Sequence, residues 1–220
     1  LREKMNQTFR YQAEDDNGSQ IFLNILLKAV QNGDVTAWTD DRFTTPLSLD
    51  ELTQKTSGGF DTADRVDIND PSKIVARVVT LKSFDPNSVI KLRIKEEWVF
   101  DRESSRMFCR ILGIAPIETK YNENGQERGS SVMFWIYYPD LRPTLTKYEV
   151  YNPKNMGQSR MTWEELFESR MFSSYILKST MDNASNKNIR QYITDPILRL
   201  LEGDNIKEKI FNFEQDLWSY

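Results

Sequence analysis

The sequence contains no histidine and only one cysteine, Cys109. Without histidine, the chain lacks the side chain that most often acts as a general base near neutral pH, and the commonest zinc ligand. It also lacks the Ser-His and Cys-His couples of nucleophilic catalysis. One cysteine permits neither an internal disulfide nor a thiolate metal cluster. Because Cys109 shares its strand parity with Met107 and Ile111, we expect it to be a small core residue.

Long apolar runs are also missing. The longest, Ile21–Val30, is interrupted by Asn24 and Lys28 and is far shorter than the ~20 residues that cross a bilayer. The chain starts at Leu1 without a signal sequence or lipidation cysteine. We therefore expect a mature or trimmed protein that does not insert into a membrane directly and is held there by a partner.

An excess of positive charge is the third absence. The chain has 29 basic and 33 acidic residues and a net charge of −4, which argues against a general nucleic-acid-binding protein. Its 220 residues are 39% hydrophobic, and a chain of this length can bury roughly 70% of its surface. These figures predict one domain, or one domain with an arm.

The first 70 residues contain helix signals followed by a polar segment. A helix is predicted over Ser19–Asn32 and ends at Gly33, and a second short helix follows the capping box of Ser48 and Glu51. Thr56–Pro71 has the composition of a loop or linker. We therefore predict an N-terminal helical arm or subdomain with linker over residues 1–70 and a core domain over 71–220.

The core domain begins with strand signals and ends with helix signals. Strands are predicted at Lys73–Leu81, Leu92–Phe100, Met107–Ile117, Val132–Tyr138 and Tyr148–Tyr151, with a hairpin turn at Asn122–Gly125. Val132–Tyr138 is apolar on both faces, so we expect both faces to be covered by protein or by another subunit. Helices are predicted at Thr162–Met171, Ile189–Ile193, Asp195–Leu201 (ended by Gly203) and Ile206–Leu217. The pattern predicts an α+β fold with a mainly antiparallel sheet at about 73–151, followed by packed C-terminal helices.

Candidate chemistry is sparse. Glu96 and Glu97 are adjacent on a predicted strand, so they point to opposite faces and cannot converge on one substrate atom. The acidic pairs Asp15–Asp16 and Asp40–Asp41 are typical of solvated turns. We therefore predict no catalytic, cofactor-binding or metal-binding residues. Glu96 and Arg110 are candidates for a structural ion pair across a hairpin, which would be costly to break if it were buried.

Several long segments resemble one known family. They are DDRFTTPLS at 40–48, IKEEWVFD at 94–101, RILGIAPI at 110–117, FWIYYPDLR at 134–142, EVYNPKN at 149–155, FESRMFSSYILK at 167–178 and IFNFEQDLWSY at 210–220. In this order they resemble gliding-motility protein N, the GldN or PorN family of the Bacteroidetes type IX secretion system.

This resemblance implies a structural, non-enzymatic part of a secretion and gliding machine. A protein of this family would lie in the periplasm, peripheral to the inner face of the outer membrane. Its partners would be an outer-membrane lipoprotein and the periplasmic part of the inner-membrane motor complex. Copies of the protein would also associate with one another, forming a ring together with the lipoprotein. No cofactor is implied.

A ring requires a contact between two different surfaces of neighbouring subunits. Large aromatic residues favour such contacts, so we take Trp38, Phe43, Trp218 and Tyr220 as candidate interface residues. Each could instead be an ordinary hydrophobic anchor. Two other functions remain open, a periplasmic small-ligand-binding module and a carboxylate-dependent glycan hydrolase.

Overall fold

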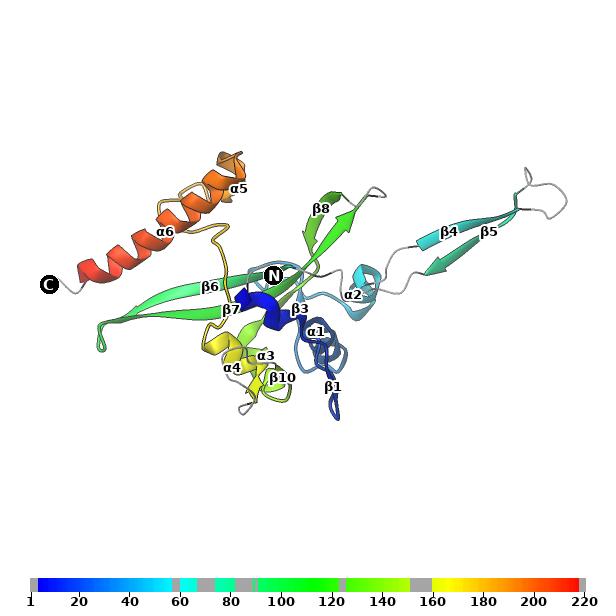
Figure 1. Ribbon diagram of the computed structural model, residues 1–220, viewed down its shortest axis with the longest axis horizontal. Helices are drawn as coiled ribbons and strands as arrows, with labels where there is room; N and C mark the ends of the chain where they lie inside the picture. Colours follow the sequence, from blue (N-terminus) through cyan, green and yellow to red (C-terminus); the bar gives the residue numbers. More distant parts are fainter. Residues whose placement is uncertain are drawn as a thin grey trace. The chain divides into compact units, whose positions relative to one another are not determined.

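A computed structural model of the chain describes residues 4–56, 60–66, 74–81, 89, 91–122, 126–150 and 160–217. Figure 1 shows the order of its elements. The helices are η1 (Lys4–Arg10, a 3₁₀ helix), α1 (Phe22–Gln31), α2 (Leu49–Thr56), α3 (Tyr138–Leu145), α4 (Trp163–Glu168), α5 (Ile189–Tyr192) and α6 (Pro196–Leu217). The strands are β1 (Glu14–Asp15), β2 (Gly18–Ser19), β3 (Ala37–Trp38), β4 (Phe60–Val66), β5 (Ile74–Leu81), β6 (Lys91–Asp101), β7 (Arg106–Tyr121), β8 (Glu127–Val132), β9 (Trp135–Tyr137), β10 (Glu149–Val150) and β11 (Met161–Thr162). The predicted α+β class with antiparallel strands is confirmed.

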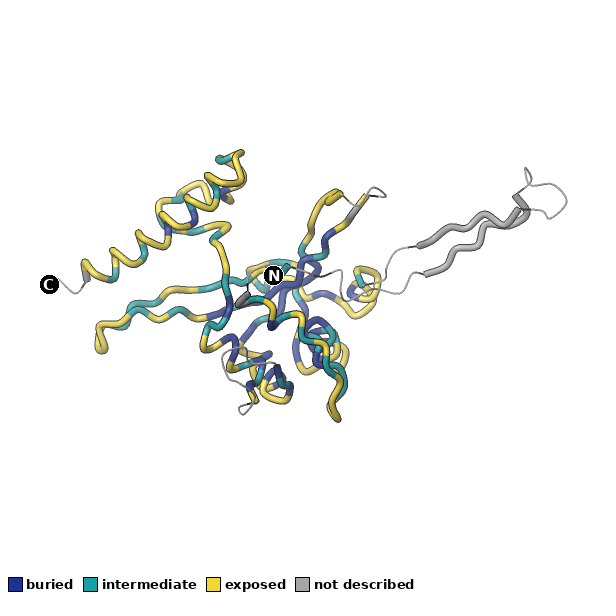
Figure 2. The backbone as a smooth tube through the Cα atoms, viewed as in Figure 1, coloured by how far each residue is buried: buried dark blue, intermediate teal, exposed yellow. Residues whose placement is uncertain are grey.

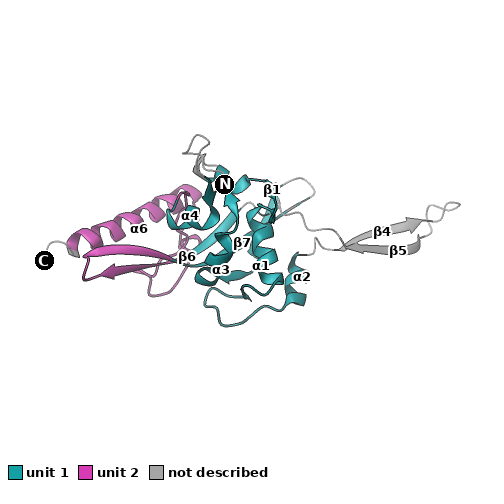
Figure 3. Ribbon diagram, turned by 90° about the horizontal axis from the view of Figure 1, so that it is seen from below, with its two compact units in different colours: residues 1–95, 111–170 teal, residues 96–110, 171–220 magenta. Residues whose placement is uncertain are grey.

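The chain forms two compact units, which Figure 3 distinguishes by colour. Unit 1 comprises residues 1–95 and 111–170, and unit 2 comprises residues 96–110 and 171–220. Helix α1, which we assigned to an N-terminal arm, belongs to unit 1 together with β9, α3 and α4. The predicted boundary between residues 70 and 71 lies outside the described residues and stays a prediction.

The main sheet has the strand order β3-β9-β7-β6, with β8 also pairing with β7. Trp38 of β3 is opposite Trp135 of β9, and Ile114 of β7 is opposite Ile136. The hairpin predicted after β7 is confirmed, since β7 pairs antiparallel with β8. Strand β7 also pairs with β6, as the proposed pair of Glu96 and Arg110 requires. The two-residue strand β3 was not predicted, because a segment this short has no periodicity.

The core of unit 1 is an aromatic cluster between η1, α1 and α4. The Phe22 ring lies 4.9 Å from that of Trp163 and 5.3 Å from that of Phe167, centroid to centroid. Phe9 packs on the same rings at 5.6–6.1 Å. Trp163 and Phe167 are fully buried. The apolar stripe predicted on α1 therefore packs within this unit. Truncation of a buried ring of this size to Ala lowers the free energy of unfolding by roughly 3–5 kcal/mol.

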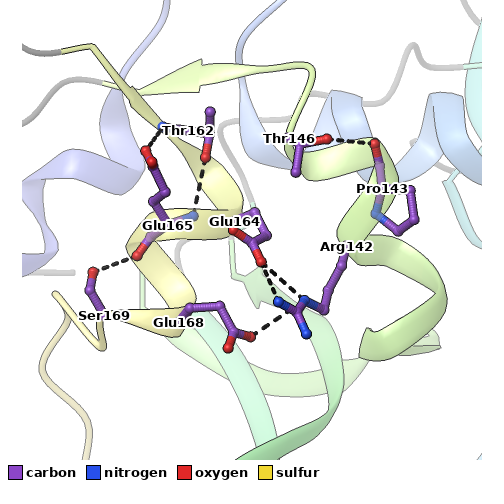
Figure 4. A network of polar contacts seen from close by, with 8 residues as sticks. All are labelled: Arg142, Pro143, Thr146, Thr162, Glu164, Glu165, Glu168 and Ser169. Carbon is purple, nitrogen blue, oxygen red and sulfur yellow. Dashed lines mark hydrogen bonds and ion pairs between the residues drawn. The ribbon is translucent and has the colours of Figure 1, made fainter.

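Helices α3 and α4 are joined by an ion pair at their surface (Figure 4). Arg142 donates to Glu164 Oε1 from Nη2 at 2.6 Å and from Nε at 3.0 Å. The predicted capping box of α4 is present, because Thr162 and Glu165 each bond to the other's backbone N–H. Helix α3 was not predicted. It starts with Pro139 in its first turn, where the missing N–H costs nothing.

Part of the predicted linker is a strand. Residues 60–66, which we assigned to a loop over Thr56–Pro71, form β4 and pair antiparallel with β5 from Phe60↔Leu81 to Val66↔Ile74. The pairing partner lies later in the chain, so local composition gave no sign of it. Together, β4 and β5 form a separate two-stranded sheet.

Unit 2 is built around one long helix, α6. Asp195 Oδ1 accepts from the N–H groups of Ile197 and Leu198, which confirms it as the helix cap. The prediction that Gly203 ends this helix is wrong, since α6 continues to Leu217. A Cβ atom added at Gly203 would lie 3.4 Å from the Ile176 carbonyl oxygen, which is ordinary van der Waals contact.

We predict that Gly203→Ala stabilises the protein. Alanine fits the space beside Ile176 and loses less backbone entropy on folding, so the gain is roughly 0.5–1 kcal/mol. Urea unfolding monitored by circular dichroism measures it. A loss of stability would mean that the backbone at residue 176 approaches α6 more closely than the structure places it.

Candidate functional site

Residues 39–46 form a closed loop on the sheet of unit 1, which we call the strap. Its ends meet because the Thr39 N–H donates to the Thr45 carbonyl at 3.0 Å and Trp38 bridges to Pro46. Inside the loop, the Thr44 N–H and hydroxyl donate to the Asp40 carboxylate at 3.0 Å and 2.5 Å. These bonds lower the pKa of Asp40, the hydroxyl bond having the larger effect. The strap is therefore fixed by its own hydrogen bonds.

Phe43 attaches the strap to the sheet. Its backbone has a left-handed φ of 58°. Its ring occupies the space above Gly113 of β7, where a Cβ atom would lie only 2.6 Å from Phe43 Cζ. The ring also packs edge-on against Tyr137 of β9 at 5.3 Å and Trp38 of β3 at 6.4 Å.

Lys95 of β6 extends this contact to the last strand of the sheet. Its Nζ lies 5.4 Å from the centroid of the Phe43 ring and donates to the Asp41 carbonyl at 2.5 Å. A cation over an aromatic face is stabilising, by about 0.5–1 kcal/mol at exposed sites. One phenyl ring thus contacts residues of β3, β9, β7 and β6.

These contacts bear on the residues that we took as interface candidates. Trp38 and Phe43 are half-buried, and packing within unit 1 accounts for both, as the anchor interpretation expects. A role for them in binding a partner stays a prediction. Trp218 and Tyr220 lie outside the described residues.

The proposed pair of Glu96 and Arg110 lies in unit 2, on β6 and β7. Glu96 is half-buried and Arg110 is exposed. Their aromatic neighbours Trp98 and Phe108 are exposed as well. The setting is therefore more open than the buried one we considered, and the ion pair itself stays a prediction. Cys109, which we expected in the core, is half-buried.

One hollow on unit 1 is polar. It has a volume of about 420 Å³ and is lined by Glu14, Asp15, Asp16, Asn17, Gln20, Lys147, Glu149 and Arg160. Several of its polar groups bind one another. Asn17 Nδ2 donates to the Lys147 carbonyl, Gln20 Oε1 accepts from the Glu149 N–H, and Arg160 pairs with the Glu149 carboxylate. Across the described parts of the chain, no three His, Cys, Asp or Glu residues are grouped to hold a metal ion.

Large exposed hydrophobic side chains are concentrated in unit 2. Among the described residues, Leu49 is the only one outside this unit. Those in unit 2 are Trp98, Phe108, Tyr175, Leu177, Tyr192, Ile197, Leu198, Leu200, Leu201, Phe211 and Phe213. Figure 2 shows α6 exposed along much of its length. By contrast, the buried hydrophobic residues described in this unit are Phe172, Ile189 and Ile206.

On α6 the exposed hydrophobic residues are spread around much of the helix, because successive residues are about 100° apart. Arg199, Gly203 and Ile206 lie on its covered side, at a spacing of three or four residues. Ile197 and Leu201 lie on the opposite side, and Ile197 is 69% exposed. An exposed cluster of this kind marks a site of interaction with another protein or a membrane. Our sequence reasoning missed it, although the run of apolar residues at 197–201 was a visible signal.

The chain was also compared with known proteins. The family model described as gliding motility associated protein GldN matches residues 1–219. The chain therefore belongs to the GldN family, as its sequence motifs predicted. No curated protein matches it. In the described part of the chain, no helix combines the length and apolar character needed to cross a membrane.

We predict that Gly113→Ala destabilises the protein, because the new methyl group takes the place of the Phe43 ring. Overpacking of this kind costs about 1–3 kcal/mol. Gly129→Ala on β8 is the matched control, since nothing lies within 4 Å of a Cβ atom there. Urea unfolding of both variants, and of Gly113→Ala combined with Phe43→Ala, measures the coupling. Equal effects at positions 113 and 129 would contradict the placement of the ring.

We also predict a pH-dependent effect of Asp40→Asn. The pKa of Asp40 is lowered in the folded protein, so its ionised form stabilises the fold at neutral pH. This contribution is lost as the pH falls through the lowered pKa. The stability difference between wild type and variant should therefore be largest near pH 7 and shrink in acid. Asp41→Asn is the control, and a difference that does not depend on pH would contradict the prediction.

Proposed function

We propose that this chain is a non-enzymatic structural component of the type IX protein secretion and gliding machinery. In this proposal it lies in the periplasm. Copies of the chain associate with one another and, together with an outer-membrane lipoprotein, form a ring. The lipoprotein holds it at the inner face of the outer membrane. It also contacts the periplasmic part of the inner-membrane motor complex. Membership of the GldN family supports the link to gliding motility, and the finer roles are our inference from the sequence motifs.

The observation that carries the proposal is the apolar surface of unit 2. A domain that works alone buries most of its large hydrophobic side chains, whereas this unit exposes far more of them than it buries. Each exposed leucine or phenylalanine that becomes covered in a complex contributes about 1.5–3 kcal/mol of transfer free energy. This surface suits a protein whose partners complete its core.

The polar hollow gives little support to the two alternative functions, a small-ligand-binding module and a glycan hydrolase. A small-ligand module would present a largely apolar pocket with a few polar groups. Here the lining is charged, Asn17 and Gln20 bond to backbone groups, and Glu149 pairs with Arg160. A glycan hydrolase would need two carboxylates that face one substrate, while Glu149 is already paired with Arg160.

We predict that Leu201→Ser weakens assembly without unfolding the chain. Leu201 and Leu49 are the same residue type, both lie in helices, and both are 53% exposed, so Leu49→Ser in unit 1 is the matched control. Loss of one interface leucine should reduce recovery of the lipoprotein partner about tenfold. The measurement is cross-linking in the native envelope, followed by purification of the tagged chain and quantification of its partners.

The outcomes separate cleanly. If Leu201→Ser loses the partners, keeps its circular dichroism spectrum, and Leu49→Ser retains them, the proposal stands. If the two variants retain their partners equally, unit 2 is not the assembly surface. If the wild-type chain recovers no lipoprotein or motor partner at all, the proposed function is wrong.

A further inference from the structure

The main sheet has one long edge that pairs with no other strand. Strand β6 is the last in the order β3-β9-β7-β6 and is eleven residues long. Among the described residues it pairs with β7 alone. Strand β8 also has an edge of this kind, but it is six residues long and contains Gly129. An exposed row of backbone N–H and C=O groups is a template for another strand.

Helix α6 approaches the other side of this hairpin. The Met107 N–H of β7 donates to Glu214 Oε1 of α6 at 3.3 Å. A backbone N–H that donates to the helix points away from β6, because the donors of a strand alternate between its two edges. At this contact α6 therefore lies on the edge of β7 that faces away from β6.

The chain also carries a hairpin with too few strands. Strands β4 and β5 pair only with each other among the described residues, over seven and eight residues. An isolated two-stranded hairpin is marginally stable in water, and a third strand is the usual remedy. The sequence of β5 is rich in Val and Ile, which favour sheet pairing.

We propose that the β4–β5 hairpin of one copy adds to the outer edge of β6 in a second copy. This inference rests on the proposed function, since it supplies the self-association of the ring. Main-chain hydrogen bonds between strands provide the affinity in contacts of this kind. Each copy carries both the donor hairpin and the acceptor edge, so the contact joins two different surfaces and repeats from subunit to subunit.

The charges on β6 fit a selective acceptor. Lys91, Arg93 and Lys95 occupy alternate positions, and Glu96 and Glu97 follow. Charged residues along an edge strand oppose unspecific pairing with other strands. Lys91 is held by Glu127 at 2.9 Å and Lys95 by the strap, whereas Arg93 is exposed. Arg93 is therefore a suitable position for a probe.

The test is cross-linking between two differently tagged copies of the full chain, co-expressed in the native envelope. Both carry Cys109→Ala. One copy carries Thr80→Cys on β5, and the other carries Arg93→Cys on β6. A short bismaleimide should join them, because the hairpin of the first copy lies beside β6 of the second. The control replaces Arg93→Cys by Ser130→Cys on β8. We expect about tenfold more mixed dimer with position 93 than with position 130, since positioned groups react far faster than colliding ones.

Each other result overturns the inference. Equal cross-linking at positions 93 and 130 would indicate unspecific contact. No cross-link in a protein that still self-associates, measured by native mass, would reject the strand contact and leave the proposed function intact. Absence of both self-association and partner recovery would instead reject the proposed function.

Discussion

The sheet of unit 1 depends on the Phe43 ring in the space above Gly113. This space exists because residue 113 has no side chain, and the ring that fills it contacts residues from β3, β9, β7 and β6. The strap holds the ring at this position through the bonds between Asp40 and Thr44. A substitution at the ring, at its space or in the strap should therefore act on one shared contact, and the effects should not be additive.

The two units differ in how they use hydrophobic residues. Unit 1 buries the rings of Phe22, Trp163 and Phe167 between η1, α1 and α4. Unit 2 keeps most of its large hydrophobic side chains at the surface of α6 and the β6–β7 tip. In the proposed function, the exposed hydrophobic surface of unit 2 is the surface that a partner covers.

Local signals in the sequence predicted much of this fold. The capping boxes at Ser48 and Thr162 and the hairpin after β7 involve residues within a few positions of each other, so their chemistry is visible without the fold. Strand β4 and the role of Gly203 depend on segments distant in the chain, so composition alone misled us there. The candidate site was harder still. Large aromatic residues made Trp38 a candidate, whereas the exposed hydrophobic surface of α6 is a property of the folded chain.

The central claim is that a partner covers the exposed hydrophobic surface of unit 2 on assembly. The most direct test is amide hydrogen–deuterium exchange of the purified chain and of the assembly isolated from its envelope. Our account predicts that exchange slows in α6 and β6 on assembly, while the strap and the polar hollow near Gln20 exchange at the same rate in both states. Slowed exchange confined to the polar hollow, with α6 unchanged, would contradict it.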